Sequence, residues 1–264
     1  MQATTFINDK FANRIALRTQ GSGPPLVLLH GGMGSLNHWH HNLNALAAHY
    51  TVHAIDMPGY GDSYTVSKAV PREAYADLVF DALNVMVPNG PFRLAAFSFG
   101  GIVAALCTTR RGERIHKLAL MAPGGFERQG PPLNLKKIPH EREGAAVMRE
   151  VLAFNLRGMM IADPAKVTDE AIDLHHANVK RTRYDGRHVS LTPGLMAQCL
   201  KQITCPVQII WGDQDTLCRP LAPRIDECRA AMPGVQIEMI LGAGHWVQYE
   251  AAETVNRLLL DFLK

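Results

Sequence analysis

Long apolar runs, paired cysteines and an excess of one charge are all missing from this sequence. No apolar run approaches the roughly 20 residues of a transmembrane helix, and residues 1–10 lack the apolar core of a signal peptide. The five cysteines are odd in number and form no CxxC pair, which argues against a disulfide framework and a thiolate metal site. The 27 Lys and Arg and 24 Asp and Glu leave +3 without a basic tail. We therefore expect a soluble, cytoplasmic protein that binds neither membrane nor nucleic acid.

Short apolar runs alternate with longer amphipathic stretches along the 264 residues, of which 47% are hydrophobic. Such runs are too short for helices and are typical of buried strands. They are 25–29, 50–55, 92–97, 117–121, 206–211 and 235–241. Apolar residues at helical spacing follow Pro71 and recur from Val255 to Phe262. This alternation predicts an α/β fold with a mostly parallel, doubly wound sheet.

The strand-like pattern stops between residues 125 and 200. Two helical stretches are expected there, at 141–157 and 168–183, and the strand pattern resumes at Pro206. Residues 1–124 and 201–264 are therefore predicted to form the core, and 125–200 an inserted helical cap. In a doubly wound sheet the ligand crevice lies at the carboxyl ends of the strands, where a cap would cover it.

A serine stands where a predicted strand meets a predicted helix. The segment AFSFGG, residues 96–101, ends one apolar run and opens another at 102–107. Strand, sharp turn and helix are the context of a nucleophile elbow, which needs small residues two before and two after the serine. Ala96 and Gly100 occupy those positions, so Ser98 is a candidate nucleophile; a serine N-cap of a helix is the alternative.

A serine hydroxyl needs a base and an orienting carboxylate before it attacks a carbonyl. Asp213 and Asp215 follow one predicted strand, and His245 follows the next. The chain order Ser, Asp, His is one known way of assembling a catalytic triad. These side chains are expected to converge at the carboxyl edge of the sheet.

Backbone N–H groups that would stabilise an oxyanion follow the first apolar run. His30-Gly31-Gly32-Met33-Gly34 comes directly after residues 25–29, and glycine lets the backbone approach a substrate closely. We expect the oxyanion donors to be the N–H of Gly32 and that of Phe99, which opens the helix after Ser98.

Taken together, these motifs resemble the α/β-hydrolase fold family. The matching segments are HGG at 30–32, DMPGYGDS at 56–63, AFSFGG at 96–101, WGDQD at 211–215 and GAGHW at 242–246. The resemblance implies a Ser98 nucleophile, a His245 base and an orienting Asp215. It selects Asp215 over Asp213 because the family's acid ends the WGxxD motif.

Residues 23–32 and 244–263 look like those of meta-cleavage product hydrolases, which split a carbon–carbon bond in ring-opened dienoates. Two positions differ from that subfamily: Phe99 follows the nucleophile in place of methionine, and His175 falls where a cap arginine grips the substrate carboxylate. Arg181, Arg183 and Arg187 are alternatives for that role. The predicted substrate contacts are Gly31, Met33, His175 and Trp246.

The function expected from the sequence is that of a cofactor-independent serine hydrolase acting on a small carboxylic ester. Cleavage of a ring-cleavage dienoate is the second hypothesis, and a hydrolase-like receptor for a small ligand is the third. His38, His40 and His41 invite a zinc hypothesis, but no Asp, Glu or Cys completes a usual ligand spacing nearby, so no metal is expected. Whether the chain forms a homo-oligomer is left open.

Overall fold

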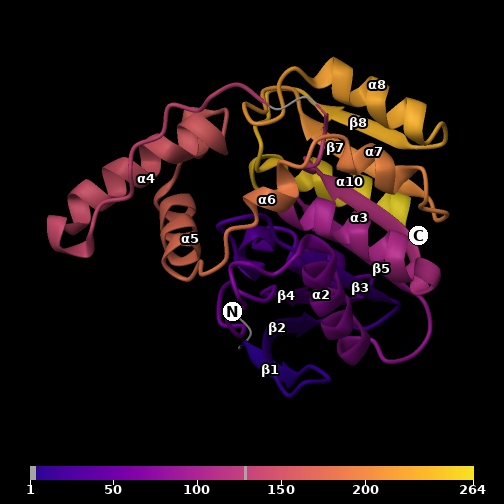
Figure 1. Ribbon diagram of the computed structural model, residues 1–264. Coiled ribbons are helices and arrows are strands. Elements are labelled where there is room, and N and C mark those ends of the chain that lie inside the picture. The colour runs from indigo at the N-terminus through magenta and orange to yellow at the C-terminus, as the bar shows by residue number, and fades with distance from the viewer. Residues whose placement is uncertain (1–3, 128–129) are drawn as a thin grey trace.

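The computed structural model describes residues 4–127 and 130–264, which contain one mixed sheet (Figure 1). Its order is β1-β2-β4-β3-β5-β6-β7-β8; β1, β2 and β4 pair antiparallel, and every pair from β4 to β8 is parallel. The strands are β1 (Thr5–Asn8), β2 (Arg14–Gln20), β3 (Pro25–Leu29), β4 (Thr51–Ile55), β5 (Phe92–Phe97), β6 (Ile115–Met121), β7 (Val207–Gly212) and β8 (Gln236–Ile240).

Helices connect the parallel strands, and two more follow the last strand. They are α1 (Leu43–Ala47), α2 (Arg72–Met86), α3 (Phe99–Arg111), α4 (Ala145–Met159), α5 (Asp169–Lys180), α6 (Arg187–Ser190), α7 (Leu195–Leu200), α8 (Leu221–Ala231), α9 (Val247–Glu250) and α10 (Ala252–Leu263). Short 3-10 helices are η1 (Leu36–Trp39), η2 (Gly112–Arg114), η3 (Glu141–Glu143) and η4 (Pro164–Lys166). Within the described residues, no helix is long and apolar enough to cross a membrane.

The six predicted strands are confirmed as β3 to β8, and the predicted α/β class with a mostly parallel sheet is confirmed with them. The sequence reasoning missed β1 and β2. These two strands form the antiparallel edge, and β1 is largely exposed, so neither has the continuous apolar run of a buried strand. The charged helix α8 was also missed, because few apolar residues mark its buried face.

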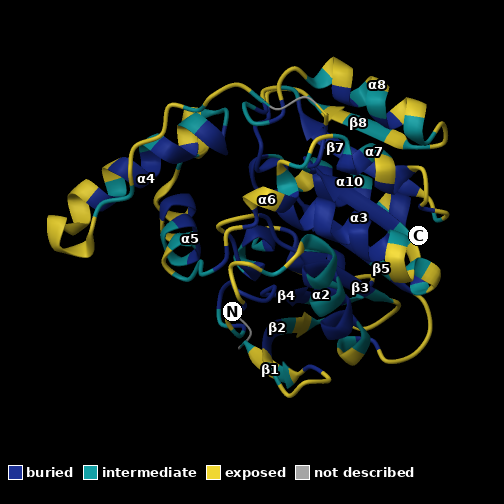
Figure 2. Ribbon diagram, in the orientation of Figure 1, coloured by how far each residue is buried: buried dark blue, intermediate teal, exposed yellow. Residues whose placement is uncertain are grey.

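Helices cover both faces of the sheet. Helices α2, α3, α7 and α8 pack in succession along one face, while α10 packs with α1 and α9 and is seen behind the strands in Figure 1. The central strands β3 to β7 and most of α3 form the continuous buried interior (Figure 2).

The segment between β6 and β7, residues 122–206, contains the two helices predicted for a cap. Helices α4 and α5 pack on each other and stand apart from the sheet (Figure 1). In contrast, α6 packs on α3, and α7 lies between α3 and α8 in the helix layer of the core. The predicted domain division stays a prediction: a core of 1–124 and 201–264 with a cap of 125–200. Residues 1–3 of the predicted core and 128–129 of the predicted cap lie outside the described residues.

The strand register brings the loops that carry the candidate residues to one edge of the sheet. Leu29 is level with Ala96, Phe97 with Met121, and Gly212 with Ile240. Because β3, β5, β7 and β8 run in the same direction, the loops after them share the carboxyl edge.

Candidate active site

Ser98 lies at the tip of a sharp turn between β5 and α3. Its backbone has φ +51° and ψ −115°, a conformation that costs a non-glycine residue about 1–3 kcal/mol. Its N–H donates to the Met121 carbonyl at 2.8 Å. A Cβ at Gly100 would lie 2.3 Å from the His30 carbonyl oxygen, so only glycine fits there. Ala96, fully buried in β5, is accommodated in place of glycine.

A chain of hydrogen bonds joins the three residues of the predicted triad. The Nε2 atom of His245 lies 2.9 Å from Ser98 Oγ, and its Nδ1 atom lies 2.8 Å from Asp215 Oδ2. Asp215 is fully buried and His245 is 3% exposed, whereas Ser98 is partly exposed. The hydroxyl is thus the member of the chain that a ligand reaches first.

The surroundings of Asp215 keep its carboxylate ionised. Burial alone would raise its pKa, but the positive charge that His245 gains on protonation and hydrogen bonds from His245 and Cys218 outweigh burial and lower the pKa below its usual value. Its Oδ1 accepts the N–H groups of Leu217 and Cys218 at 2.9 and 3.0 Å. Asp213, in contrast, is half-exposed and accepts the N–H of Gly242 at 2.6 Å, as a turn residue does.

The loop after β3 lies against the elbow. A Cβ at Gly31 would lie 2.8 Å from Phe97 Cδ1 and 3.1 Å from Ser98 Cβ, and one at Gly32 would lie 3.7 Å from Phe99 Cβ. Met33 has φ +47° and is 41% exposed. The N–H of Phe99 belongs to the first turn of α3, where it has no acceptor within the helix. Gly31 therefore lies against Ser98 and Gly32 against Phe99; the role of the Gly32 and Phe99 N–H groups as oxyanion donors stays a prediction.

Two buried histidines that the sequence reasoning did not assign hold this loop. His30 Nε2 accepts the Met57 N–H at 2.9 Å while its Nδ1 donates to the Gly31 carbonyl at 2.8 Å. The N–H of Gly31 donates to His38 Nδ1 at 3.1 Å. Each ring nitrogen that accepts an N–H carries no proton, so both rings are neutral. Burial agrees with this: it lowers the pKa of His30 to about 4 and that of His38 well below its usual value.

His175, on the buried face of α5, is a neutral side chain as well. It is 3% exposed, and burial, followed by the charge of His176, lowers its pKa to about 4. After burial and the charge of a protonated His30, the charge that His175 would carry if protonated is a further cause that lowers the pKa of His38. Within the described residues, His175 Nδ1 and the side-chain nitrogen of nearby Asn178 have no hydrogen-bond partner.

The three arginines considered as carboxylate ligands already have partners. Arg181 pairs with Asp62 at 2.9 Å, and Arg187 pairs with Asp185 at 2.6 Å on the surface. Arg183 donates to the backbone carbonyls of Gly61 and Ser63 at 3.0 and 2.5 Å. Arg181 and Arg183 thus connect the segment after α5 to the core, whereas Arg187 lies in solvent.

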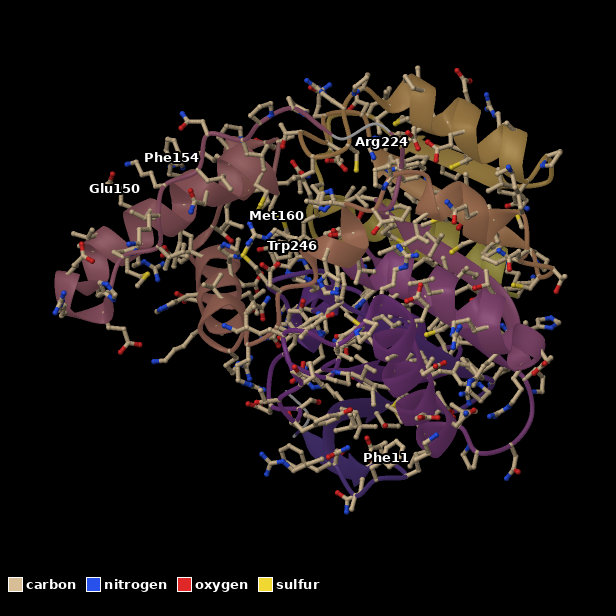
Figure 3. All side chains as sticks on the ribbon, viewed as in Figure 1. Phe11, Glu150, Phe154, Met160, Arg224 and Trp246 are labelled. Carbon is tan, nitrogen blue, oxygen red and sulfur yellow. The ribbon has the colours of Figure 1, made fainter. Side chains whose placement is uncertain are left out.

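Trp246, predicted to contact substrate, is fully buried beside the triad. Its indole N–H donates to the His38 carbonyl at 3.0 Å, its backbone N–H donates to the Met160 carbonyl at 2.8 Å, and its ring stacks on Tyr249 at 4.3 Å. Figure 3 labels Trp246 and Met160 close together where the 122–206 segment meets the core. The contact of Trp246 with substrate stays a prediction.

Glu250, within the 244–263 segment, was assigned no role from the sequence. Its carboxylate is 4% exposed and accepts backbone N–H groups from Gly244 at 2.7 Å, Asp163 at 2.7 Å and Ala162 at 3.1 Å. It thereby links the His245 loop to the segment after α4. The sequence signal is weak, because Glu250 ends the four-residue helix α9, in which Gln248 is also polar.

Two groups of side chains in the described part of the chain lie close enough to hold a metal ion. One is Asp215, Cys218 and His245, but both ring nitrogens of His245 are already engaged by the triad. The other is His40, His41 and Glu170, outside the triad. This second group could not be recognised from the sequence, because Glu170 lies 129 residues after His41.

The fold and this geometry agree with the similarity to known proteins. A model of the alpha/beta hydrolase family matches residues 26–258. A 2-hydroxy-6-oxononadienedioate/2-hydroxy-6-oxononatrienedioate hydrolase of Burkholderia vietnamiensis is 28% identical over 98% of this chain and 93% of its own length. The dihydrolipoyllysine-residue acetyltransferase component of the acetoin cleaving system of Pseudomonas putida is 30% identical over 92% of this chain, which spans 64% of that relative.

Among solved structures, the naproxen esterase (carboxylesterase NP) of Bacillus subtilis superposes with a TM-score of 0.80 at 20% identity, covering 99% of this chain and 91% of the esterase. At this identity the likeness concerns the fold. The chain belongs to the alpha/beta hydrolase family, and it is an enzyme of that family.

Proposed function

We propose that this enzyme is a serine hydrolase that cleaves a small carboxylic ester through an acyl-enzyme. The observation that carries the proposal is the continuous hydrogen-bonded chain from Ser98 through His245 to the buried, ionised Asp215. Asp215 accepts the Nδ1–H of His245, which leaves Nε2 unprotonated and directed at the serine hydroxyl.

In the proposed reaction, Ser98 Oγ attacks the ester carbonyl as its proton moves to His245 Nε2. The backbone N–H groups of Gly32 and Phe99 stabilise the oxyanion, each contributing about 3 kcal/mol to transition-state stabilisation. His245 then returns the proton to the leaving alkoxide, and the acyl group stays on Ser98. Water, activated by the same histidine, releases the acid and restores the serine.

A neutral acyl group suits the surroundings of Ser98 better than an acidic one. A dienoate substrate carries a carboxylate, which a protein binds best with a planar guanidinium or another cation. His175 is buried and neutral, and Arg181, Arg183 and Arg187 are engaged elsewhere. The proposed substrate contacts are Gly31, Met33, His175 and Trp246.

The carbon–carbon hydrolase is the second proposal. It is favoured by the Burkholderia vietnamiensis relative, a named dienedioate hydrolase that this chain covers over 93% of its length. The same serine and oxyanion donors would serve that reaction.

We also propose that residues 125–200 act as the cap over the site, that the substrate is a small molecule, and that the enzyme works in the cytoplasm.

The test is kcat/KM for the wild type and Ser98→Ala on short-chain p-nitrophenyl esters and on a ring-cleavage dienoate. We expect esters to be preferred and both activities to disappear in Ser98→Ala. A preference for the dienoate by about 100-fold, or about 2.7 kcal/mol of transition-state discrimination, would establish the second proposal instead. A wild type no faster than Ser98→Ala on every substrate would favour a receptor with an idle triad.

A further inference from the structure

Two histidines of the core face one glutamate of α5, away from the triad. His40 and His41 follow η1, and Glu170 lies in the first turn of α5. His40 Nε2 is 3.2 Å from Glu170 Oε1, and His41 Nε2 is 2.7 Å from Glu170 Oε2. The side chains are 24%, 34% and 48% exposed, so water and ions reach them.

The three side chains offer ligand atoms at a spacing close to that of a metal site. One nitrogen of each ring and one oxygen of the carboxylate all lie within 4.8 Å of one another. Ligands bound at about 2.0–2.2 Å in a tetrahedron lie about 3.3 Å apart, so small rotations of the side chains would bring all three to one ion. Two imidazoles and a carboxylate are ligands of Zn²⁺ and of the other late divalent first-row metals.

Tyr249 orients two of these ligands. Its ring stacks on His41 with centroids 4.4 Å apart and an interplanar angle of 20°, and its hydroxyl donates to Glu170 Oε2 at 3.2 Å. The same hydroxyl lies 3.3 Å from Thr168 Oγ1, the N-cap of α5. Outer partners of this kind fix ligand geometry in metal sites. The cluster is therefore held in place before any ion arrives.

We propose that His40, His41 and Glu170 bind one divalent transition-metal ion, with water completing a tetrahedral site. On binding, His41 Nε2 gives up its hydrogen bond to Glu170, and His40 Nε2 its contact with the same carboxylate, for a bond to the metal; the proton of each neutral ring moves to Nδ1. The ion joins the segment after η1, in the core, to α5 in the 122–206 segment. It thus fastens α5 to the core at a point separate from the triad.

The test uses the untagged wild type, His41→Gln and Glu170→Gln, with His49→Gln as the matched control, since His49 is an exposed histidine outside the cluster. Zn²⁺ binding is measured by titration calorimetry, and Co²⁺ binding by the visible absorption of the tetrahedral ion. Circular dichroism without metal establishes that each variant is folded.

We expect one Zn²⁺ per chain in the wild type and in His49→Gln, a tetrahedral Co²⁺ spectrum, and a higher thermal midpoint with metal. His41→Gln and Glu170→Gln should each lose at least about tenfold in affinity. Absence of stoichiometric binding in the wild type would overturn the proposal. So would binding that persists unchanged in both variants, which would place the ion elsewhere, for example at Asp215, Cys218 and His245.

Discussion

The buried carboxylate of Glu250 accepts the backbone N–H of Gly244 at 2.7 Å, one residue before His245. Through its other contacts, to the N–H groups of Ala162 and Asp163, the same carboxylate reaches the segment after α4. The position of the proposed catalytic base is thus set jointly by the core and by the segment between β6 and β7.

Glu250→Gln should therefore lower both stability and activity. The glutamine amide presents N–H donors toward backbone donors, which leaves buried groups unpaired and costs about 2–4 kcal/mol. We expect a lower free energy of unfolding in urea and a reduced kcat. Glu253→Gln, an exposed residue of α10, should stay within about 0.5 kcal/mol of the wild type. Equal effects of the two substitutions would refute this role of Glu250.

Asp215→Asn should reduce kcat by about 10³–10⁴-fold because the amide no longer fixes the His245 tautomer. Asp213→Asn is the matched control, since an asparagine oxygen still accepts the Gly242 N–H and the residue lies outside the hydrogen-bonded chain. Steady-state ester hydrolysis measures both. A large loss of kcat in Asp213→Asn with little loss in Asp215→Asn would reverse the assignment of the acid.

Gly31→Ala should impair the nucleophile directly. The added Cβ would stand 2.8 Å from the Phe97 ring and 3.1 Å from Ser98 Cβ, so the elbow has to shift. We expect kcat to fall by about tenfold or more, since small displacements of a reacting group are costly. Gly234→Ala, where no atom lies within 4 Å of the new Cβ, serves as control. An active Gly31→Ala enzyme would show that the loop moves freely.

Acid should destabilise the fold through its buried neutral histidines. The unfolded pKa of histidine is about 6.5, whereas that of His175 is about 4 in the fold. Between these values the unfolded state binds more protons, so the stability present above pH 6.5 is lost as the pH falls toward 4.

His175→Gln removes that titration. Between pH 7 and 4.5 the wild type should lose about 2–3 kcal/mol more free energy of unfolding than this variant. His176→Gln, its more exposed neighbour, should follow the wild type. Urea unfolding at several pH values measures the difference; parallel curves for the wild type and His175→Gln would show that His175 is protonated in the fold.

The parallel part of the sheet could be predicted because buried strands are continuous apolar runs, and the triad because its residues directly follow such strands. The strands β1 and β2 were not predicted because β1 is largely exposed and only three consecutive residues of β2 are buried. The contacts of Glu250 with Ala162 and of Glu170 with His41 could not be predicted because they span 88 and 129 residues of sequence. Only the fold shows that His175 is buried and that Arg181 and Arg183 are engaged by the loop after β4.

Covalent labelling of the nucleophile tests the central claim most directly. The protein is treated with a fluorophosphonate, and the modified peptide is located by mass spectrometry in the wild type, Ser98→Ala and His245→Ala. We expect one adduct per wild-type chain, on Ser98, with none in Ser98→Ala and much slower labelling in His245→Ala. An unlabelled wild type, or an adduct that persists in Ser98→Ala, would contradict the assignment of Ser98 as the activated nucleophile.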